Sequence, residues 1–547
     1  MIKEDTVGIK KSSLSLAVSL LLLSGISVSH ASTETPVAPT NTIGGDPFLK
    51  AVVVSDSMEP AIPHPEQDKI AEQKLRALKQ KTGKAPNVLI FLVDDMGWGD
   101  LGVYGGGEAV GAPTPNIDKL AQQGLRFTSF YAQPFSTPSR AAMMTGRMPN
   151  RTGLTRPILT GEKITQNPWA GEKTAAGILS DSGYQTALSG KWHLGESDGT
   201  YPHQNGYDEY YGILPVVSNM TEMLDERIYP NLVNNPELNA KLKAIQPPEI
   251  TSGVEGGPLK IEQKLENLDE IRELDQQFAD YSDSFIRQNK DKPFYLVHSF
   301  SRLHNDNYPA EGYKGKSPAK FPYKDGVIEV DDIVGRLMKT LKDTGQLENT
   351  LVFFTSDNGA NEDVWPDSGF HPWKGGKGTT WEGGIRVPGI AYWPGMIKPG
   401  RVSDGIIDIL DLFNTSVAVA GQSNKIPKDR YIDGIDQTGF LLADNGESNR
   451  ETAYFYAFNQ FTALRWNEYK VHFKVMQTSA TRKNIDQTTI QTASPAPWVY
   501  NLYMDPKEQQ ASHIGFEWGY PRVVGLAKYH AGTYKKYPPK DIGLNVP

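Results

Sequence analysis

Four oxygen-bearing side chains stand directly after two apolar segments of the chain. Asp94 and Asp95 follow the run 88–93, and Asp357 and Asn358 follow the run in NTLVFFTS. Carboxylate and amide oxygens, with no cysteine or histidine among them, suit Ca²⁺ or Mg²⁺. Adjacent carboxylates repel one another, so a cation is the simplest reason to place them together. Either pair alone is more often an ordinary turn, but their matching positions favour a metal site.

The segment QPFSTPSRAAMMTGR places Ser136 where a helix is expected to begin. Thr137 is a candidate helix cap, Pro138 suits the first turn, and Gly146 can close the helix. The free N–H groups and the dipole of a helix N-terminus favour an anion. Arg140, one turn along, adds a planar cation suited to an oxyanion. The pattern predicts a tetrahedral anion held beside a nucleophile and a metal.

Four short apolar runs are expected to position these groups. Each run ends in polar residues, in APNVLIFLVDDMGWGD, YQTALSGKWHLG, KPFYLVHSFSRLH and NTLVFFTSDNG, and helical stretches such as DDIVGRLMKTLKDTG separate them. This alternation indicates an α/β fold with a large, mixed but mostly parallel sheet flanked by helices. Ligands of such sheets gather at the carboxyl ends of the strands. The continuous apolar run 88–93 is typical of a strand buried on both faces.

The chain of 547 residues is expected to divide into four parts. Residues 1–31 have the pattern of a signal peptide, with lysines, an apolar run and a small-x-small cleavage site after Ala31. Residues 32–84 are expected to be a linker and a surface helix. Residues 85–430 form the main domain, with an insertion at 230–275. Residues 431–547 form a smaller α+β subdomain, in which TAYFYAF and YKVHFKVM indicate antiparallel strands.

Composition limits the partners and the compartment. A net charge of −8 argues against nucleic acid as the main partner. The absence of cysteine excludes disulfides, thiolate metal sites and thiol nucleophiles. No apolar run reaches the ~20 residues of a membrane span. The signal favours an exported protein in a Gram-negative periplasm, with secretion as the alternative, and the sequence does not indicate an oligomeric state.

Taken together, the motifs resemble those of the type I sulfatases. The segment S-T-P-S-R resembles the family signature, in which Cys or Ser begins the pattern, and Arg140 stands in the position of the family's arginine. GKWHLG (190–195) and GKGTTWEGGIRVPG (376–389) resemble two further motifs, and PNVLIFLVDDMGWGDLG and TSDNG resemble the metal-binding segments. The resemblance runs in order over residues 86–421. It implies an alkaline-phosphatase-like fold and an arylsulfatase-like hydrolase.

The resemblance implies that Ser136 is oxidised after synthesis to Cα-formylglycine. One hydroxyl of the hydrated aldehyde, a geminal diol, attacks sulfur, and the other expels sulfate. A plain serine would instead be left as a stable sulfate ester. In this respect the chain resembles the sulfatases whose serine is oxidised by a radical-SAM sulfatase-maturating enzyme before export. Such an enzyme is therefore an expected partner.

The family's functional residues have matches in this sequence. Arg140 and Lys191 would stabilise the diol and the sulfate charge, His193 would deprotonate the second hydroxyl, and Lys377 would bind sulfate and neutralise the leaving oxygen. The matches to the Ca²⁺ ligands, with Mg²⁺ less favoured, are Asp94, Asp95, Asp357 and Asn358.

Other matches are less direct. His304 resembles the leaving-group acid that the family often places in a His-x-Pro stretch, but FSRLHNDNYP places the proline four residues further on. We prefer His304 to His298 for this role. Ser218 resembles a family serine that touches the diol. His371 and Trp373 either line the substrate pocket or pack within a loop.

The sequence therefore predicts hydrolysis of an aryl or carbohydrate sulfate ester. A phosphatase or phosphodiesterase of the same superfamily is one alternative, and a sulfoglycan-binding protein without turnover is another if Ser136 stays unmodified. Recognition of the leaving group is expected to depend on the C-terminal subdomain and on loops at 104–110, 200–260, 305–320 and 361–373. Many exported bacterial relatives act on sulfated polysaccharides, so a carbohydrate sulfate is the expectation from resemblance.

Overall fold

The computed structural model describes residues 41–159, 162, 164–476, 490–512 and 515–544. The expected signal peptide, residues 1–31, and the first part of the expected linker, residues 32–40, lie outside the described residues. Within the described part of the chain, no helix has the length and apolar character needed to cross a bilayer.

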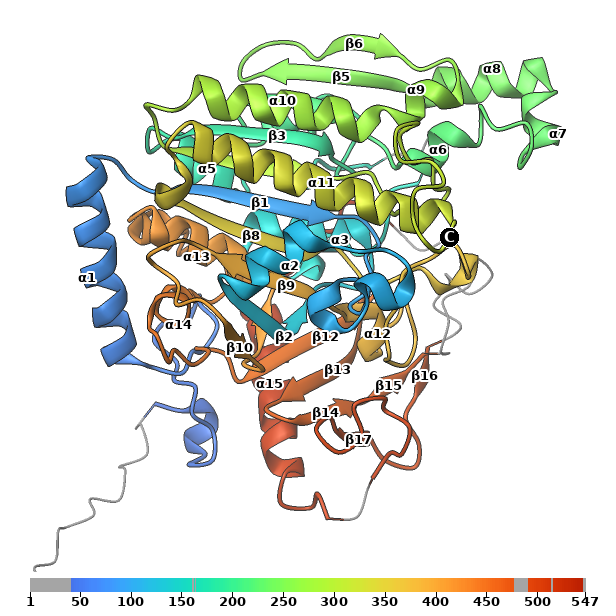
Figure 1. Ribbon diagram of the computed structural model, residues 1–547. Helices are drawn as coiled ribbons and strands as arrows, with labels where there is room; N and C mark the ends of the chain where they lie inside the picture. The colour runs from blue at the N-terminus through green and yellow to red at the C-terminus, as the bar shows by residue number, and fades with distance from the viewer. Residues whose placement is uncertain (1–40, 160–161, 163, 477–489, 513–514, 545–547) are drawn as a thin grey trace, which may run out of the picture. The chain divides into compact units, whose positions relative to one another are not determined.

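A sheet of eleven strands runs through the described residues (Figure 1). In the order of hydrogen-bonded neighbours, its strands are β10 (Arg401–Ser403), β2 (Leu125–Tyr131), β9 (Arg386–Tyr392), β8 (Thr350–Ser356), β1 (Asn87–Val93), β7 (Phe294–Ser299), β3 (Gln185–Lys191), β4 (Glu209–Ile213), β5 (Glu249–Val254) and β6 (Lys260–Lys264), with β11 (Ile407–Asp408) also paired to β2. Strands β8, β1, β7, β3 and β4 are parallel to one another. Strands β9, β5 and β6 run antiparallel to their neighbours.

The four strands expected from the sequence are direct neighbours in this sheet. β1 pairs in parallel with β8 on one side and with β7 on the other, and β7 pairs in parallel with β3. Because the strands are parallel, their carboxyl ends lie along one edge of the sheet, where ligands of such folds bind. The prediction of an α/β fold with a mostly parallel sheet is confirmed.

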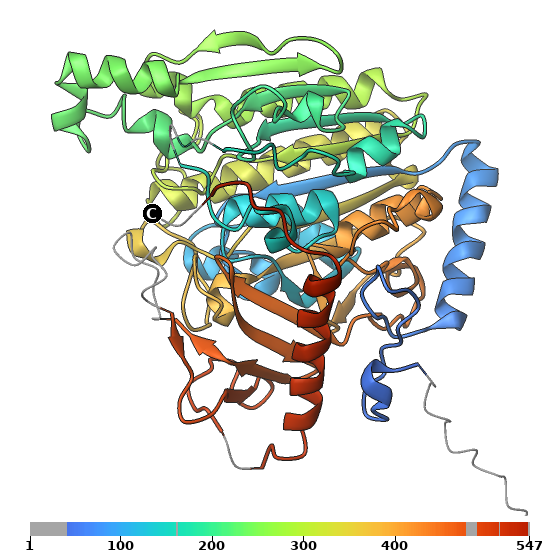
Figure 2. The ribbon, with the colours of Figure 1, turned by 180° about the vertical axis from the view of Figure 1, so that it is seen from behind.

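Helices cover both faces of the sheet (Figures 1 and 2). Ile90 of β1 belongs to the same core as Met143, whereas Phe91 belongs to the core that contains Val330. Alternate residues of β1 thus face two different layers of helices, which explains why every residue from Val88 to Val93 is apolar. The helices of the first layer are α3 (Ser136–Thr145), α5 (Ala175–Ser180) and α13 (Asp411–Val419), and those of the second are α2 (Pro115–Gln122), α10 (Leu274–Gln288) and α11 (Pro322–Asp343).

A second, antiparallel sheet lies in the C-terminal part of the chain (Figure 2). His530 of the last helix stacks on Tyr454 with ring centroids 3.9 Å apart, which attaches that helix to the sheet. The prediction of an antiparallel sheet in the C-terminal part of the chain is confirmed. Its strands are β12 (Thr452–Ala457), β13 (Gln460–Trp466), β14 (Tyr469–His472) and β17 (Trp498–Asn501), beside a ribbon of β15 (Lys474–Val475) and β16 (Gln491–Thr492) and the helix α15 (Tyr520–Lys536).

The segment 230–275, expected as an insertion, contains regular structure. β5 and β6 continue the main sheet beyond β4, and two short helices lie past this end of the sheet (Figure 1). The domain boundaries themselves stay a prediction. The helices of this segment are α7 (Pro230–Val233), α8 (Pro236–Ile245) and α9 (Leu268–Arg272), and the remaining α-helices are α1 (Pro65–Thr82), α4 (Pro149–Thr152), α6 (Val217–Thr221), α12 (Glu382–Ile385) and α14 (Thr438–Leu442).

The described part of the expected N-terminal linker packs onto the main domain. Ile43 and Leu49 are buried in the hydrophobic core. The backbone N–H groups of Lys50 and Ala51 donate hydrogen bonds to the carboxylate of Glu451. The expectation of a flexible linker is therefore wrong for residues 41–48, because this stretch contributes buried side chains to the fold.

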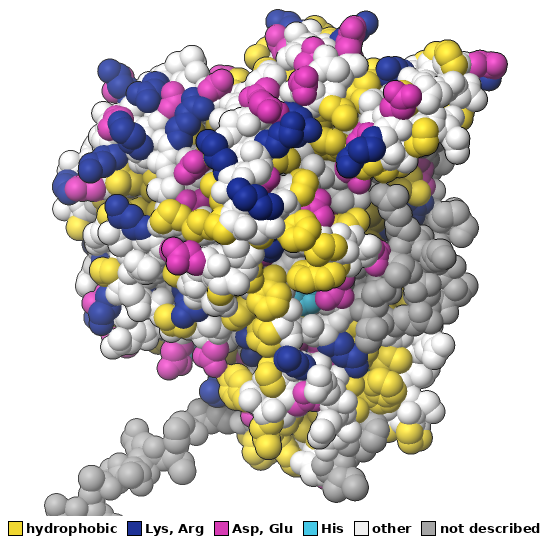
Figure 3. Space-filling view, turned by 45° about the vertical axis from the view of Figure 1, so that its right-hand side comes forward, with side chains coloured by type: hydrophobic (Ala, Val, Ile, Leu, Met, Phe, Trp, Pro, Cys, Tyr) yellow, Lys and Arg dark blue, Asp and Glu magenta, His cyan; other side chains and the backbone are white. Residues whose placement is uncertain are grey.

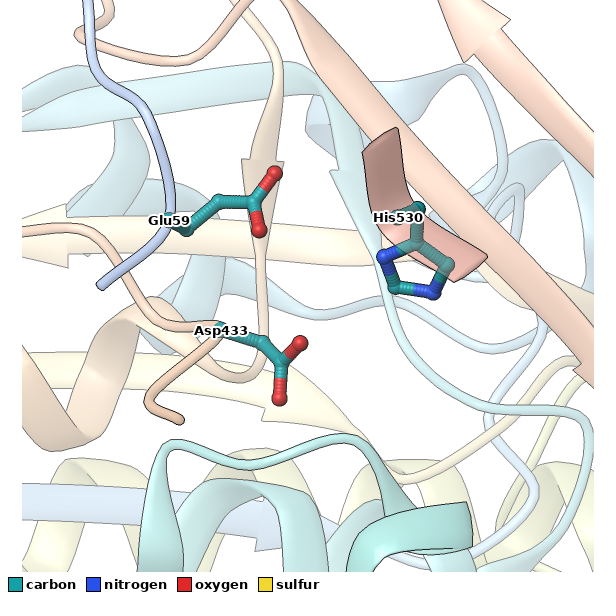
Figure 4. Close-up of side chains that lie close together, drawn as sticks. All are labelled: Glu59, Asp433 and His530. Atoms are coloured by element: carbon teal, nitrogen blue, oxygen red, sulfur yellow. The ribbon is translucent and has the colours of Figure 1, made fainter. Parts of the chain in front are cut away.

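Three buried ionisable side chains meet where the N-terminal segment, the main domain and α15 come together (Figure 4). Glu59, Asp433 and His530 all point toward one another there. Arg151 neutralises Asp433 by donating from Nε and Nη2, at 2.8 and 2.9 Å, to its two oxygens. The hydroxyl of Tyr431 donates to Glu59 Oε2 at 2.9 Å. Burial, with the nearby Asp433 charge, raises the pKa of Glu59 to about 7.

Charges on the molecular surface are mixed in sign. On the face drawn in Figure 3, Lys and Arg side chains are interspersed with Asp and Glu side chains. This agrees with the small net charge of −8. The absence of a nucleic-acid partner stays a prediction.

Candidate active site

The three carboxylates expected to bind a metal lie together at the carboxyl ends of β1 and β8. Oxygens of Asp94, Asp95 and Asp357 lie within 4.8 Å of one another, and all three side chains are fully buried. They meet because β1 and β8 are parallel neighbours in register, with Val93 opposite Ser356. Burial and the nearby Asp94 charge raise the pKa of Asp357. A buried cluster of like charges of this kind requires compensation by cations.

The unpaired oxygens of this cluster fit a hard cation. Among the described residues, Asp94 Oδ1 and Asn358 Oδ1 are buried and have no hydrogen-bond partner. The amide of Asn358 donates from Nδ2 to Asp95 Oδ1 at 2.7 Å, so Asn358 lies against the carboxylates. Buried polar atoms without hydrogen-bond partners are costly, so these two oxygens are well suited to bind a cation. An oxygen-only donor set of three carboxylates and one amide suits Ca²⁺ or Mg²⁺.

Ser136 is the first residue of α3, which is buried throughout. The helix cap differs from the prediction: Phe135 is the N-cap residue, and no side chain caps the helix. Thr137 instead donates from Oγ1 to the carbonyl of His193 at 2.8 Å, because a tertiary contact competes for its hydroxyl. Gly146 ends the helix as predicted, with φ of 64° in the left-handed region.

Arg140 connects Ser136 with the carboxylate cluster. Its Nε donates to Ser136 Oγ at 2.9 Å, and its Nη2 donates to Asp357 Oδ2 at 2.9 Å. Its Nη1 donates to the carbonyl of Lys191 at 3.1 Å and to Ser299 Oγ at 2.5 Å. The guanidinium is 3% exposed, so these bonds fix it in one orientation. Arg140 therefore places a positive charge against the serine oxygen and one of the carboxylates.

The Lys191 and His193 side chains reach the same point from the end of β3. Lys191 Nζ donates to Asp94 Oδ2, and both groups are fully buried. Burial lowers the pKa of Lys191, although Asp94 opposes this effect. His193 Nδ1 lies 3.2 Å from Ser136 Oγ. Burial and the neighbouring cations Lys191 and Arg140 lower the pKa of His193 well below its usual value, so the ring is neutral.

Lys377 contacts the carboxylate cluster at Asp95. Its Nζ lies 2.8 and 2.9 Å from the two oxygens of Asp95. Burial alone would lower the pKa of Lys377, but Asp95 and the other carboxylates outweigh it and raise the pKa. The C-terminal sheet supports the following segment, because Lys470 Nζ donates to Glu382 Oε1 of α12 at 2.8 Å. The ammonium group of Lys377 therefore stays charged beside the three carboxylates.

A cavity of about 360 Å³ opens over Ser136. His304 and Ser218 line it, together with the catalytic candidates His193 and Lys377. Burial, followed by the charge of Lys377, lowers the pKa of His304 to about 3. His298, the candidate we did not prefer, is buried in β7, and its Nδ1 bonds to Ser282 Oγ at 2.8 Å. The geometry thus favours His304 over His298 as a group that meets a substrate.

His371 and Trp373 are not among the residues that line this cavity, which favours loop packing, the other of the two alternatives. His371 Nε2 lies 3.3 Å from Glu362 Oε1. The ring of Trp373 packs edge-on against Trp98, with centroids 5.0 Å apart, and under the guanidinium of Arg386. Both side chains serve the packing of their loop, which was the alternative that the sequence left open.

Several residues of the site had no motif to indicate them. Ser299 follows a predicted strand and bonds both Arg140 and the Lys191 carbonyl, so its position at the strand end was the available signal. The cavity wall also includes the segment 156–159, which the sequence did not suggest. Among the described residues, the expected loop 104–110 and the C-terminal sheet contribute no wall residue. The other wall residues are Phe135, Val216, Asn219, Glu222, Asn305, Asn361 and Asp363.

Known proteins are similar to this chain in sequence. Residues 86–422 match the sulfatase family, and residues 448–528 match the C-terminal region of aryl-sulfatase. N-acetylgalactosamine-6-sulfatase of Canis lupus familiaris is 33% identical over 452 residues, covering 78% of this chain and 81% of the relative. Arylsulfatase A of Homo sapiens is 33% identical over 471 residues, covering 81% of this chain and 87% of the relative.

Solved structures are also similar to this chain in fold. The crystal structure of PsFucS1 sulfatase from Pseudoalteromonas sp. has a TM-score of 0.89 and 54% identity, covering 91% of this chain and 100% of that chain. The structure of Ps i-CgsB in complex with k-i-k-neocarrahexaose has a TM-score of 0.63 and 25% identity, covering 82% of this chain and 93% of that chain. From its sequence, its fold and the side chains around Ser136, the chain belongs to the sulfatase family of sulfuric ester hydrolases.

Proposed function

We propose that this sulfatase hydrolyses a carbohydrate sulfate monoester to an alcohol and inorganic sulfate, with residue 136 as the nucleophile. The observation that carries the proposal is the position of Ser136 Oγ. It lies between a cation, Arg140 Nε at 2.9 Å, and a neutral base, His193 Nδ1 at 3.2 Å, at the foot of the cavity. A tetrahedral sulfate placed there would lie beside Lys377 and beside the cation that the carboxylate cluster is proposed to hold.

His193 is placed to take a proton from residue 136. Because Ser136 Oγ accepts a hydrogen bond from Arg140, its own proton is free to point at the lone pair of His193 Nδ1. The lowered pKa of His193 keeps the ring unprotonated and ready to accept. Oxidised to formylglycine and hydrated, residue 136 would supply two hydroxyls, one to attack sulfur and one whose deprotonation releases sulfate.

His304 and Lys377 are placed on the leaving-group side. His304 donates its Nδ1–H to the carbonyl of Asn305 at 2.5 Å, which leaves Nε2 free to carry a proton toward the cavity. Burial, followed by the charge of Lys377, lowers the pKa of His304 in the free enzyme, and the negative charge of a bound sulfate would oppose the effect of Lys377. The two groups together would neutralise the oxygen that departs with the alcohol.

A divalent cation, which we propose to be Ca²⁺, fits the oxygens of Asp94, Asp95, Asp357 and Asn358. The cation would withdraw electron density from an oxygen placed on it and would stabilise negative charge there. The carboxylates themselves hold Lys191, Lys377 and Arg140 in place through the bonds described above. These three cations surround the position of the sulfate.

The proposed substrate class rests on the cavity and on the relatives. Amide, hydroxyl and carboxylate groups, including Ser218 and Asn219, are interspersed on the cavity wall with apolar residues, as suits a polyhydroxylated ring. The relatives named above include a sulfatase of an amino sugar and a structure that holds a carrageenan oligosaccharide. We further propose export to the periplasm, since residues 1–31 have a signal-peptide pattern, and oxidation of Ser136 by a radical-SAM maturase.

The test combines mass spectrometry with a substrate panel. Protein made together with a serine-type maturase should yield a tryptic peptide 127–140 that is lighter by two hydrogens and reacts with a carbonyl reagent. The same protein should release sulfate from p-nitrophenyl sulfate and from at least one monosulfate of galactose, glucose, fucose or N-acetylgalactosamine. Matured protein that releases sulfate from none of these esters would contradict the proposed function.

A further inference from the structure

We propose that Asn305, held by Asn361, is a specificity-determining residue that binds a hydroxyl on the carbon next to the sulfated position of the substrate. The inference rests on the proposed sulfatase function and narrows it to leaving groups that carry such a neighbouring hydroxyl. Both asparagines line the cavity that contains Ser136, His304 and Lys377.

The first argument is the orientation of the Asn305 amide. Asn361 donates from Nδ2 to Asn305 Oδ1 at 2.9 Å, which fixes the acceptor end of the Asn305 amide. Among the described residues, nothing accepts a hydrogen bond from Asn305 Nδ2. Asn305 is 5% exposed and lines the cavity, so the surface that it retains is available to a bound ligand there. A nearly buried donor on a cavity wall gains by binding an acceptor on the ligand.

The second argument is the place of Asn305 next to the leaving-group side of the site. Its backbone carbonyl accepts the Nδ1–H of His304, so one residue both orients that histidine and presents an amide to the cavity. A hydroxyl on the carbon adjacent to the ester oxygen lies beside the atom that His304 would protonate. The amide is therefore placed to bind the neighbouring hydroxyl rather than the sulfate, which Arg140 and Lys377 would hold.

The third argument concerns charge. Glu222 and Asp363 also line this wall, and neither would favour a second sulfate or a carboxylate next to the sulfate being cleaved. The cation Arg156 lines the wall too, but it donates to Glu162 Oε2 at 2.8 Å, which offsets its charge. An uncharged hydroxyl is compatible with carboxylates and amides alike, because it both donates and accepts. The wall therefore selects a neutral neighbour for the sulfated carbon.

The experiment uses the matured enzyme and the sugar monosulfate that it hydrolyses fastest in the panel described above. The matched probes are two analogues of that sugar, each deoxygenated at one of the carbons next to the sulfated carbon. We expect one analogue to lose about three- to tenfold in kcat/KM with the wild-type enzyme, the contribution of one neutral hydrogen bond. Asn305→Ala should abolish this difference, because it removes the amide and retains the carbonyl that orients His304.

Two further variants separate recognition from structure. Asn361→Ala releases the acceptor end of the Asn305 amide and should reduce the ratio of kcat/KM for the sugar to kcat/KM for the affected analogue. This variant provides the test if Asn305→Ala fails to fold. Asn307→Ala is the matched control, because Asn307 lies in the same loop but donates to the carbonyl of Asp367 at 3.3 Å and is no part of the cavity wall. Asn307→Ala should keep the wild-type ratio of kcat/KM between the sugar and the analogue.

The outcomes distinguish the two proposals. Equal kcat/KM for the sugar and both analogues in the wild-type enzyme would overturn the role of Asn305, as would equal losses on all probes in the Asn305 and Asn361 variants. Hydrolysis of p-nitrophenyl sulfate without hydrolysis of any sugar sulfate would also overturn it, while leaving the sulfatase activity intact. An enzyme that is inactive on every ester would contradict the proposed function itself, and the role of Asn305 with it.

Discussion

Replacing Glu59 by glutamine is expected to remove a loss of stability that the protein undergoes as the pH rises. Burial is the main cause that raises the pKa of Glu59 from 4.5 to about 7 in the folded protein. Between these two values the folded state holds a proton that the unfolded state has released. The stability contributed by this proton is therefore fully present below pH 4.5 and is lost as the pH rises through about 7.

The magnitude follows from the difference between the two pKa values. Linkage gives a loss of about 2.5 kcal/mol in the free energy of unfolding between pH 5 and pH 8 from this one group. For a chain of this length, that loss corresponds to about 2 °C in the unfolding temperature. Glutamine resembles the protonated carboxyl, so Glu59→Gln should be as stable as the wild type at pH 5 and more stable at pH 8.

Differential scanning fluorimetry of the two proteins from pH 5 to pH 8 measures this effect. Other buried carboxyls with raised pKa values, such as Asp408, also weaken the fold at high pH, so only the difference between the two proteins reports on Glu59. Glu66→Gln on the exposed surface of α1 controls for the loss of one carboxylate. Parallel pH profiles of wild type and Glu59→Gln would refute the reasoning. Destabilisation of Glu59→Gln at every pH, with a larger fall in the unfolding temperature on chelation in the wild type than in the variant, would instead indicate a metal ion at Glu59, Asp433 and His530.

Three further predictions concern the active site. Ser136→Ala and His193→Ala should each abolish sulfate release without changing the circular dichroism spectrum, and near-native turnover by either purified variant would contradict the mechanism. His304→Ala should lower kcat for sugar sulfates by roughly 10²–10⁴, the contribution of general acid catalysis, and lower it far less for p-nitrophenyl sulfate, whose leaving group needs little protonation; equal losses on both would exclude His304 as the acid. Chelation should remove activity and lower the unfolding temperature, with Ca²⁺ restoring both better than Mg²⁺, and recovery with Mg²⁺ alone would contradict the Ca²⁺ assignment.

The main sheet could be predicted because its central strands are buried on both faces. β1 is apolar at every position from Val88 to Val93, and the polar residues begin directly after the strand, at Asp94. The end of the apolar run therefore marks the edge where the site lies. The cap of α3 could not be predicted in the same way. Thr137 is a good capping residue in isolation, but in the fold its hydroxyl bonds to the His193 carbonyl, 56 residues away in the chain.

Part of the candidate site could likewise be predicted from local sequence, and part depends on tertiary packing. The groups around the sulfate position stand in dense motifs at strand ends, so the sequence indicated them. The cavity wall is made by loops whose contacts depend on tertiary packing. Asn305 and Asn361 are ordinary loop residues in the sequence, and only the folded chain brings their amides within 2.9 Å. Trp373, an obvious candidate for stacking on a substrate, is instead held by Trp98 and Arg386.

The complete burial of α3 has a consequence for the order of events in the cell. Ser136 is 1% exposed, and every residue of its helix is inside the protein, so an enzyme that oxidises this serine has no access to it once the chain has folded. If Ser136 is oxidised as proposed, maturation and folding therefore compete for the same newly made chain. Molecules that fold first would keep a serine permanently and would be stable but inactive. Slower synthesis, a higher level of maturase or delayed folding should each raise the active fraction of a preparation without altering its amount or its unfolding temperature.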